Sequence, residues 1–211
     1  KKKTLEVTVE EMRNFAFNYI EKFAPSKQQL KTYLLKKYLK SKTPINRSNV
    51  SNLIDIVLED LEKSKFINDK FYSESKAKSL IQRGSSINKI RNYLIGKGVG
   101  DKYIKNTIDQ IRENNEDQDF FSAIKICKKK RIGPSRQEDN RPLFYKKDMG
   151  VLARSGFGFE GSRRGVALDK DGYKKNYLQV SYTNCCRDVR CIKHYSYFIK
   201  RSSILRTIRE L

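Results

Sequence analysis

The chain has 211 residues and a mass of 24.7 kDa, and its 46 Lys and Arg against 24 Asp and Glu give a formal net charge of +22. This excess predicts a polyanionic partner: nucleic acid, a nucleoprotein assembly or an acidic protein surface. No apolar run exceeds three residues, which argues against a membrane-spanning helix or a signal-peptide core. One His and four Cys leave little material for a catalytic triad, a His-rich metal site or a disulfide scaffold, so we expect a cytoplasmic protein without a metal or another cofactor.

The N-terminal part of the chain predicts three amphipathic helices. Thr8 with Glu11 and Ser26 with Gln29 both fit capping boxes, which begin the first and second helices. Pro25 ends the first of them. After a polar loop, a third helix carries apolar residues at a spacing of three and four: Val50, Leu53, Ile54, Val57, Leu58 and Leu61.

The following residues continue in the same way. Asn68 or Asp69 begins a fourth helix, Ser86 a short fifth and Asp101 a sixth, and a seventh is predicted over Glu116–Lys130. This region has no period-two alternation of any length and no Asn-Gly hairpin turn. The patterns together predict an all-α fold.

The capping and apolar positions repeat along the chain. Matching residues in Ser26–Lys37 and Ser86–Lys97 are sixty positions apart, and in the helices that follow Ile54, Leu58 and Leu61 match Ile104, Ile108 and Ile111 at an offset of fifty. Chance similarity between amphipathic helices is the alternative, but the matched caps, tyrosines and lysines favour true repeats. Because a unit of three short helices buries little surface alone, we expect neighbouring units to stack into an elongated row.

The repeats predict four segments, namely a first three-helix repeat with a lead-in (1–66), a second repeat (67–114), a third and degenerate repeat (115–168), and an irregular basic extension with Tyr and Cys (169–211). Glycines weaken the last helix of the third repeat, since each costs about 1 kcal/mol relative to Ala: Gly150, Gly158, Gly161 and Gly165. We expect Leu34 and Leu94 to be buried at equivalent places, and likewise Leu58 and Ile108.

The stretch Ser86–Val99 resembles the signature of the RecX family of bacterial recombination regulators, in which a Ser-capped, Leu-rich short helix precedes Lys-Gly-Val or Lys-Gly-Phe. Ile67–Tyr72 is similar to a helix start of that family, with Asn68 in place of its first Asp, and Lys146–Phe157 suggests a third unit. The resemblance covers roughly Met12–Leu168. It implies a non-enzymatic protein that binds the RecA recombinase filament on DNA and mainly inhibits it. Separately, we expect the protein to be a monomer.

Basic side chains recur beside the repeated motifs. The candidates for contact with the partner and with DNA phosphates are Lys36, Lys37, Arg83, Lys89, Arg91, Lys97, Arg154, Arg163 and Arg164. Solvated helix faces would explain many of them equally well. No recognition-helix pattern occurs, so we expect DNA binding without sequence specificity. A helical-repeat nucleic-acid-binding module without recombinase specificity is the alternative function, and an enzyme is disfavoured because no nucleophile and base pair is evident.

Three further patterns lie in the last third of the chain. Cys185, Cys186, Cys191 and His194 form a metal-like cluster, but the spacing lacks a Cys-x2-Cys knuckle and favours free thiols over zinc. Ser155–Ser162 contains a G-x-G-x-x-G match without the preceding strand that dinucleotide binding requires. Residues 172–211 mix Tyr with basic residues, which fits either an irregular extension, the interpretation we favour, or base stacking on single-stranded nucleic acid.

Overall fold

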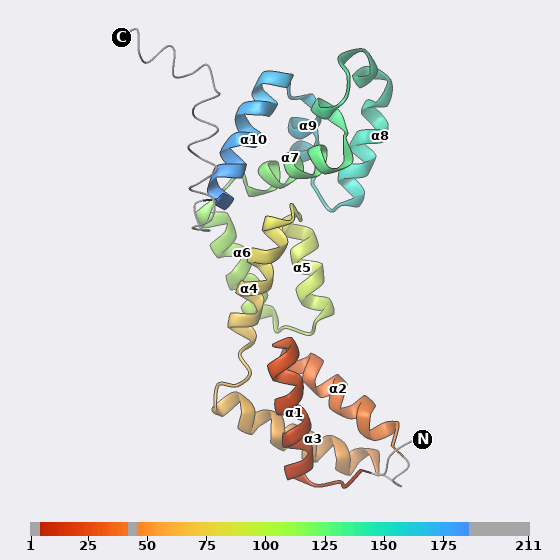
Figure 1. Ribbon diagram of the computed structural model, residues 1–211, viewed down its shortest axis with the longest axis vertical. Helices are drawn as coiled ribbons and strands as arrows, with labels where there is room; N and C mark the ends of the chain where they lie inside the picture. Colours follow the sequence, from red (N-terminus) through yellow and green to blue (C-terminus); the bar gives the residue numbers. More distant parts are fainter. Residues whose placement is uncertain (1–4, 42–45, 186–211) are drawn as a thin grey trace, which may run out of the picture. The chain divides into compact units, whose positions relative to one another are not determined.

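The computed structural model describes residues 5–41 and 46–185, and every regular element in these ranges is a helix (Figure 1). The predicted all-α class is therefore confirmed. The chain divides into two compact units, Lys1–Gln118 and Asp119–Leu211, which we describe separately. The finer segment boundaries at residues 66, 114 and 168 stay predictions.

The first unit contains six helices, which are α1 (Val9–Phe23), α2 (Lys27–Leu39), α3 (Arg47–Lys63), α4 (Asp69–Gln82), α5 (Ile87–Gly96) and α6 (Asp101–Asn114). Helices α1 to α5 begin with a side-chain cap. The cap expected from Asp101 is wrong, because α6 begins after Gly100 without a side-chain cap and Asp101 is its first residue. Thr8 accepts the Glu11 N–H, and Ser26 and Gln29 complete a capping box. The helix α1 ends at Ala24, which adopts a left-handed φ of 40° directly before Pro25.

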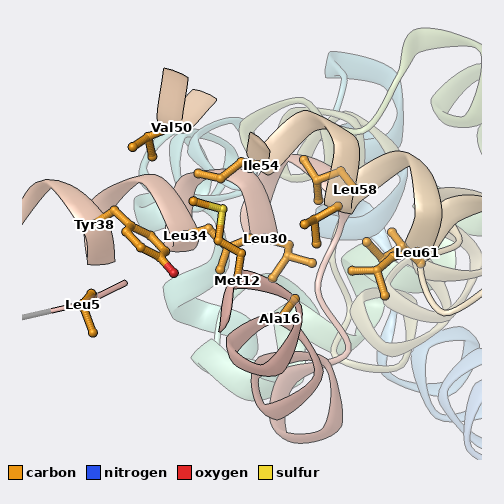
Figure 2. Close-up of a cluster of buried hydrophobic side chains, with 12 residues drawn as sticks. Leu5, Met12, Ala16, Leu30, Leu34, Tyr38, Val50, Ile54, Leu58 and Leu61 are labelled. Atoms are coloured by element: carbon orange, nitrogen blue, oxygen red, sulfur yellow. The ribbon is translucent and has the colours of Figure 1, made fainter. Parts of the chain in front are cut away.

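The helices α1, α2 and α3 enclose one apolar core. Their periodic apolar residues point toward one another in Figure 2, and Leu34 is fully buried between the flanking helices. Tyr38 in α2 and Met12 in α1 are also fully buried. This core forms because each of the three helices presents an apolar face at the 3.6-residue period.

A second core lies between α4, α5 and α6. Leu94 in α5 is as completely buried as Leu34 in α2, and Leu58 and Ile108 are each 1% exposed. The predicted burial at these four matched positions is confirmed. The offsets of sixty and fifty residues therefore relate positions that have the same role in the two cores.

Polar contacts join the two three-helix sets of the first unit. The Ser26 Oγ donates a hydrogen bond of 2.6 Å to the Lys97 carbonyl, and the Lys27 N–H donates one of 2.9 Å to an Asp69 carboxylate oxygen. Gly98 has a φ of +68° and lies so close to Gln28 that any Cβ at this position would collide with the Gln28 side chain. The Lys-Gly-Val motif after α5 thus packs against the N-terminus of α2, and we call this contact between the two three-helix sets the joint.

The second unit contains α7 (Gln118–Lys130), which starts at its border, followed by α8 (Arg141–Arg154), α9 (Phe159–Ala167) and α10 (Lys170–Cys185), with short 3-10 turns between α7 and α8. Its core includes Cys127, Leu152, Phe157 and Val166. The glycines inside α9 do not prevent the helix. A Cβ at Gly165 would lie 3.3 Å from the Ala123 Cβ, so this glycine allows α9 to pack closely against α7.

The expectation of an irregular extension from residue 169 is wrong for residues 170–185, which form α10. Asp169 caps this helix by accepting the Gly172 N–H at 3.0 Å. Tyr173 and Tyr177 are spaced by four residues, and Tyr173 accepts a hydrogen bond from Ser135. This spacing of four residues is typical of one face of a helix, although the basic composition of the segment favours an irregular extension. The side chain of Cys185, and residues Cys186, Cys191 and His194, lie outside the described part of the chain.

Candidate functional site

The helices α2, α5 and α8 carry basic residues without an exposed carboxylate. The helices α2 and α5 contain no Asp or Glu, and the single acid of α8, Asp148, is 1% exposed. The neighbouring helix α3, by contrast, contains Asp55, Glu59, Asp60 and Glu62. We refer to α2, α5 and α8 as the middle helices. Their cations are the best candidates in the described residues for binding an anionic partner.

On α2 the cations fall into two groups. Lys27 and Lys31 form ion pairs of 2.6 Å with Glu62 and Asp55 of α3. Lys36 is exposed and Lys37 is half-buried, and neither has an ion-pair partner among the described residues. The two predicted residues are thus the cations of α2 that remain available to a partner.

Lys37 also rests on aromatic rings. Its Nζ lies 3.5 Å from the centroid of the Phe15 ring and 5.6 Å from that of Tyr33, four residues earlier in α2. Lys97, sixty positions further on, has its Nζ 5.3 Å from the centroid of Tyr93, again four residues earlier. Such contacts hold an ammonium group in place without neutralising it.

The remaining predicted residues of the first unit are Arg83, Lys89 and Arg91, and all three are exposed. Arg83 caps the end of α4, whereas Lys89 and Arg91 project from α5. The structure does not gather the predicted cations into one pocket. The Lys97 carbonyl contacts Ser26 at the start of α2, whereas Lys37 lies eleven residues further along the same helix. At 1.5 Å per residue, the Lys97 and Lys37 backbones are therefore about 16 Å apart. The cations therefore form a distributed surface.

In the second unit, the three predicted arginines differ in their surroundings. Arg154 is exposed in the last turn of α8 and has no ion-pair partner among the described residues. Arg163 forms an exposed ion pair of 3.0 Å with Glu160. The hydrogen bond and the positive charge of Arg163 lower the pKa of the Glu160 carboxyl. Arg164 lies 4.6 Å over the centroid of the Phe120 ring. Arg154 is the strongest of the three candidates.

An ion pair in the same unit, between the half-buried Arg136 and the buried Asp148, was not indicated by any pattern in the sequence. Arg136 donates two hydrogen bonds, of 2.8 and 2.9 Å, to Asp148, which also accepts the Gly133 N–H at 2.8 Å. Burial alone would raise the pKa of Asp148, but the hydrogen bonds from Arg136 and Gly133 and the guanidinium charge outweigh it and lower the pKa. Because Gly133 and Arg136 lie in the segment between α7 and α8, these hydrogen bonds hold that segment against α8.

Other chemistry-bearing groups of the described residues do not form a site. Burial raises the pKa of the Cys127 thiol to about 12, so it remains protonated and unreactive. Within residues 5–41 and 46–185 no group of three His, Cys, Asp or Glu side chains is placed to hold a metal ion. None of the described helices combines the length and apolar character that crossing a membrane requires.

The fold and the cationic middle helices define a helical-repeat protein with a surface suited to an anionic partner. No family model matches the sequence, and no solved structure matches it either. The Regulatory protein RecX of Myxococcus xanthus (strain DK1622) is 31% identical to the chain over an alignment of 163 residues, and the alignment covers 75% of this chain and 85% of that protein. The chain therefore belongs to the RecX family, as the Ser86–Val99 motif predicted.

Proposed function

We propose that the protein is a cytoplasmic regulator that binds the RecA recombinase filament on DNA and lowers its activity. The observation that carries the proposal is the 31% identity, over most of both chains, with a relative named as a regulatory protein. The exposed cations of the middle helices support it, because a filament on DNA presents phosphates and acidic protein surface.

The mechanism in this proposal is occupancy and not catalysis. The protein lies on the filament as a monomer, and its middle-helix cations contact DNA phosphates or acidic protein groups. Lys36, Arg91 and Arg154 are suited to this role because they are exposed and have no ion-pair partner among the described residues. The bound protein then blocks the addition of RecA subunits or the turnover of ATP.

The direct test is a titration of the ATPase activity of preformed RecA filaments on single-stranded DNA. We expect the rate of ATP hydrolysis to fall as the protein is added, at concentrations that leave naked DNA largely unbound. Unchanged hydrolysis at saturating protein would remove the proposal.

The exposed, unpaired cations also support a second candidate, a nucleic-acid-binding module without preference for the recombinase. The same titration separates the two. For such a module, inhibition would follow the occupancy of naked DNA and would be overcome by adding competitor DNA. For a filament regulator, inhibition persists when competitor DNA is present.

A further inference from the structure

The two matched helix pairs of the first unit differ in charge at the positions where their helices face one another. At the offset of fifty residues, Asp55 and Glu62 of α3 correspond to Lys105 and Arg112 of α6. The buried pair Leu58 and Ile108 confirms that this offset aligns equivalent faces. These two of the four acids of α3 thus correspond to cations in α6.

The replaced acids have a defined role in the first three-helix set. Asp55 pairs with Lys31 of α2, and Glu62 pairs with Lys27, each at 2.6 Å. Glu59, which forms no ion pair in the described residues, corresponds to another acid, Asp109. Asp60 corresponds to Gln110, and the sign also reverses in the opposite sense between Lys63 and Glu113. Acids are therefore replaced by cations only at the two positions of α3 that neutralise the middle helix.

By the same comparison, Arg91 of α5 and Lys105 of α6 occupy the positions that the ion-paired Lys31 and Asp55 have in the first set. Arg91 is the counterpart of Lys31 at the offset of sixty, and it lies on the helix that packs against α6. Arg91, Lys105 and Arg112 are exposed, and none forms an ion pair among the described residues. Two cations at these matched positions repel one another, whereas the first set has an attractive pair there.

We propose that Arg91, Lys105 and Arg112 form a binding patch for the phosphodiester backbone of nucleic acid. A planar guanidinium beside an ammonium group provides several donors for the oxygens of one phosphate. The seven-residue rise from Lys105 to Arg112 extends the patch by about 10 Å along α6, which is enough for successive phosphates of a strand. The patch rests on the proposed function, since it assigns DNA contact in the filament to the second three-helix set.

Lys105→Asp is the sharpest test, because it restores the arrangement of Lys31 and Asp55 in the second set. We expect an unchanged or raised melting temperature together with weaker binding of a fluorescein-labelled single-stranded oligonucleotide, measured by anisotropy. Each lost phosphate contact should weaken binding about five- to tenfold at 50 mM salt and make the dependence on salt less steep by about 0.7. Lys78→Asp, the same charge change at an exposed site on α4, is the matched control.

The outcomes separate this patch from the proposed function. Equal losses of oligonucleotide affinity in Lys105→Asp and Lys78→Asp would overturn the patch, because only net charge would then matter. Normal oligonucleotide binding by Lys105→Asp with weaker filament binding would also overturn it and assign the patch to acidic protein surface. A specific loss of oligonucleotide binding, in a protein whose wild type leaves the RecA ATPase unchanged, would support the patch and remove the proposed function.

Discussion

The helix pairs α2–α3 and α5–α6 share their apolar spacing but not their charges. In the first pair, Lys31 is neutralised by Asp55 at 2.6 Å, whereas Arg91 and Lys105 occupy the matching positions of the second. Both pairs nevertheless enclose a fully buried leucine, at Leu34 and at Leu94. The apolar positions therefore determine the three-helix packing, and the surface charges are free to differ between sets.

The largest expected effect concerns what the two sets have in common. Leu34→Ala and Leu94→Ala should each lower the free energy of unfolding by about 2–5 kcal/mol, because each leaves a cavity in a closed core. Urea denaturation followed by far-UV circular dichroism measures the loss. A loss below about 1 kcal/mol at one position only, near the cost of an ordinary point substitution, would show that the two leucines are not equivalent.

A second effect tests the joint that connects the sets. Gly98→Ala should destabilise the protein by about 1–3 kcal/mol, because residue 98 has a positive φ and its Cβ would meet Gln28. Gly96→Ala is the control, since nothing lies within 4 Å of its Cβ position, and it should be neutral or stabilising. Equal melting temperatures for the two variants would show that the close contact of Gly98 with Gln28 does not contribute to stability.

The second unit provides a test of the buried ion pair. Asp148→Asn should lower stability by about 1–3 kcal/mol, because the substitution removes the charge that Arg136 contacts and leaves one of its bonds unmade. The pKa of Asp148 is lowered in the folded state, so its contribution is present above the ordinary Asp pKa and is lost as the pH falls through the lowered value. Wild-type stability should therefore fall at acidic pH more steeply than that of Asp148→Asn, in urea titrations at several pH values.

The smallest expected effect on stability belongs to the exposed cations. Arg91→Glu and Arg154→Glu should each change the free energy of unfolding by no more than about 0.5 kcal/mol. Circular dichroism melts provide the measurement, with Lys78→Glu as a matched exposed control. A loss of several kcal/mol would show that these side chains support the fold and are not available to a partner.

The sequence predicted the helices of the first unit because apolar period and side-chain caps are local signals. Thr8, Ser26 and the stripe of α3 all appear in the structure as expected. The helix α9 looked doubtful because helix propensity penalises glycine, while the close approach of Gly165 to Ala123 depends on packing between distant segments. The sequence did not predict α10, because a segment rich in basic residues resembles an irregular extension. The four-residue spacing of Tyr173 and Tyr177, which fits one face of a helix, is the signal that indicates it.

The candidate site was less predictable than the fold. The sequence shows that the middle helices are rich in Lys and Arg. Which of these lysines form ion pairs depends on acidic side chains that lie on other helices. Lys31 and Lys36 look alike in sequence, and only the packing of α2 on α3 places Asp55 beside the first. Arg136 and Asp148 are twelve residues apart and carried no motif that indicated a buried pair.

In the proposed function, exposed cations of the middle helices attach the protein to a RecA filament. Filament binding as a function of salt tests this directly, for the wild type and for a variant with Lys36, Arg91 and Arg154 each changed to Glu. We expect wild-type affinity to fall steeply with rising salt, and the folded variant to bind more weakly and with a shallower dependence on salt. Binding that is insensitive to salt and unchanged in the variant would contradict it.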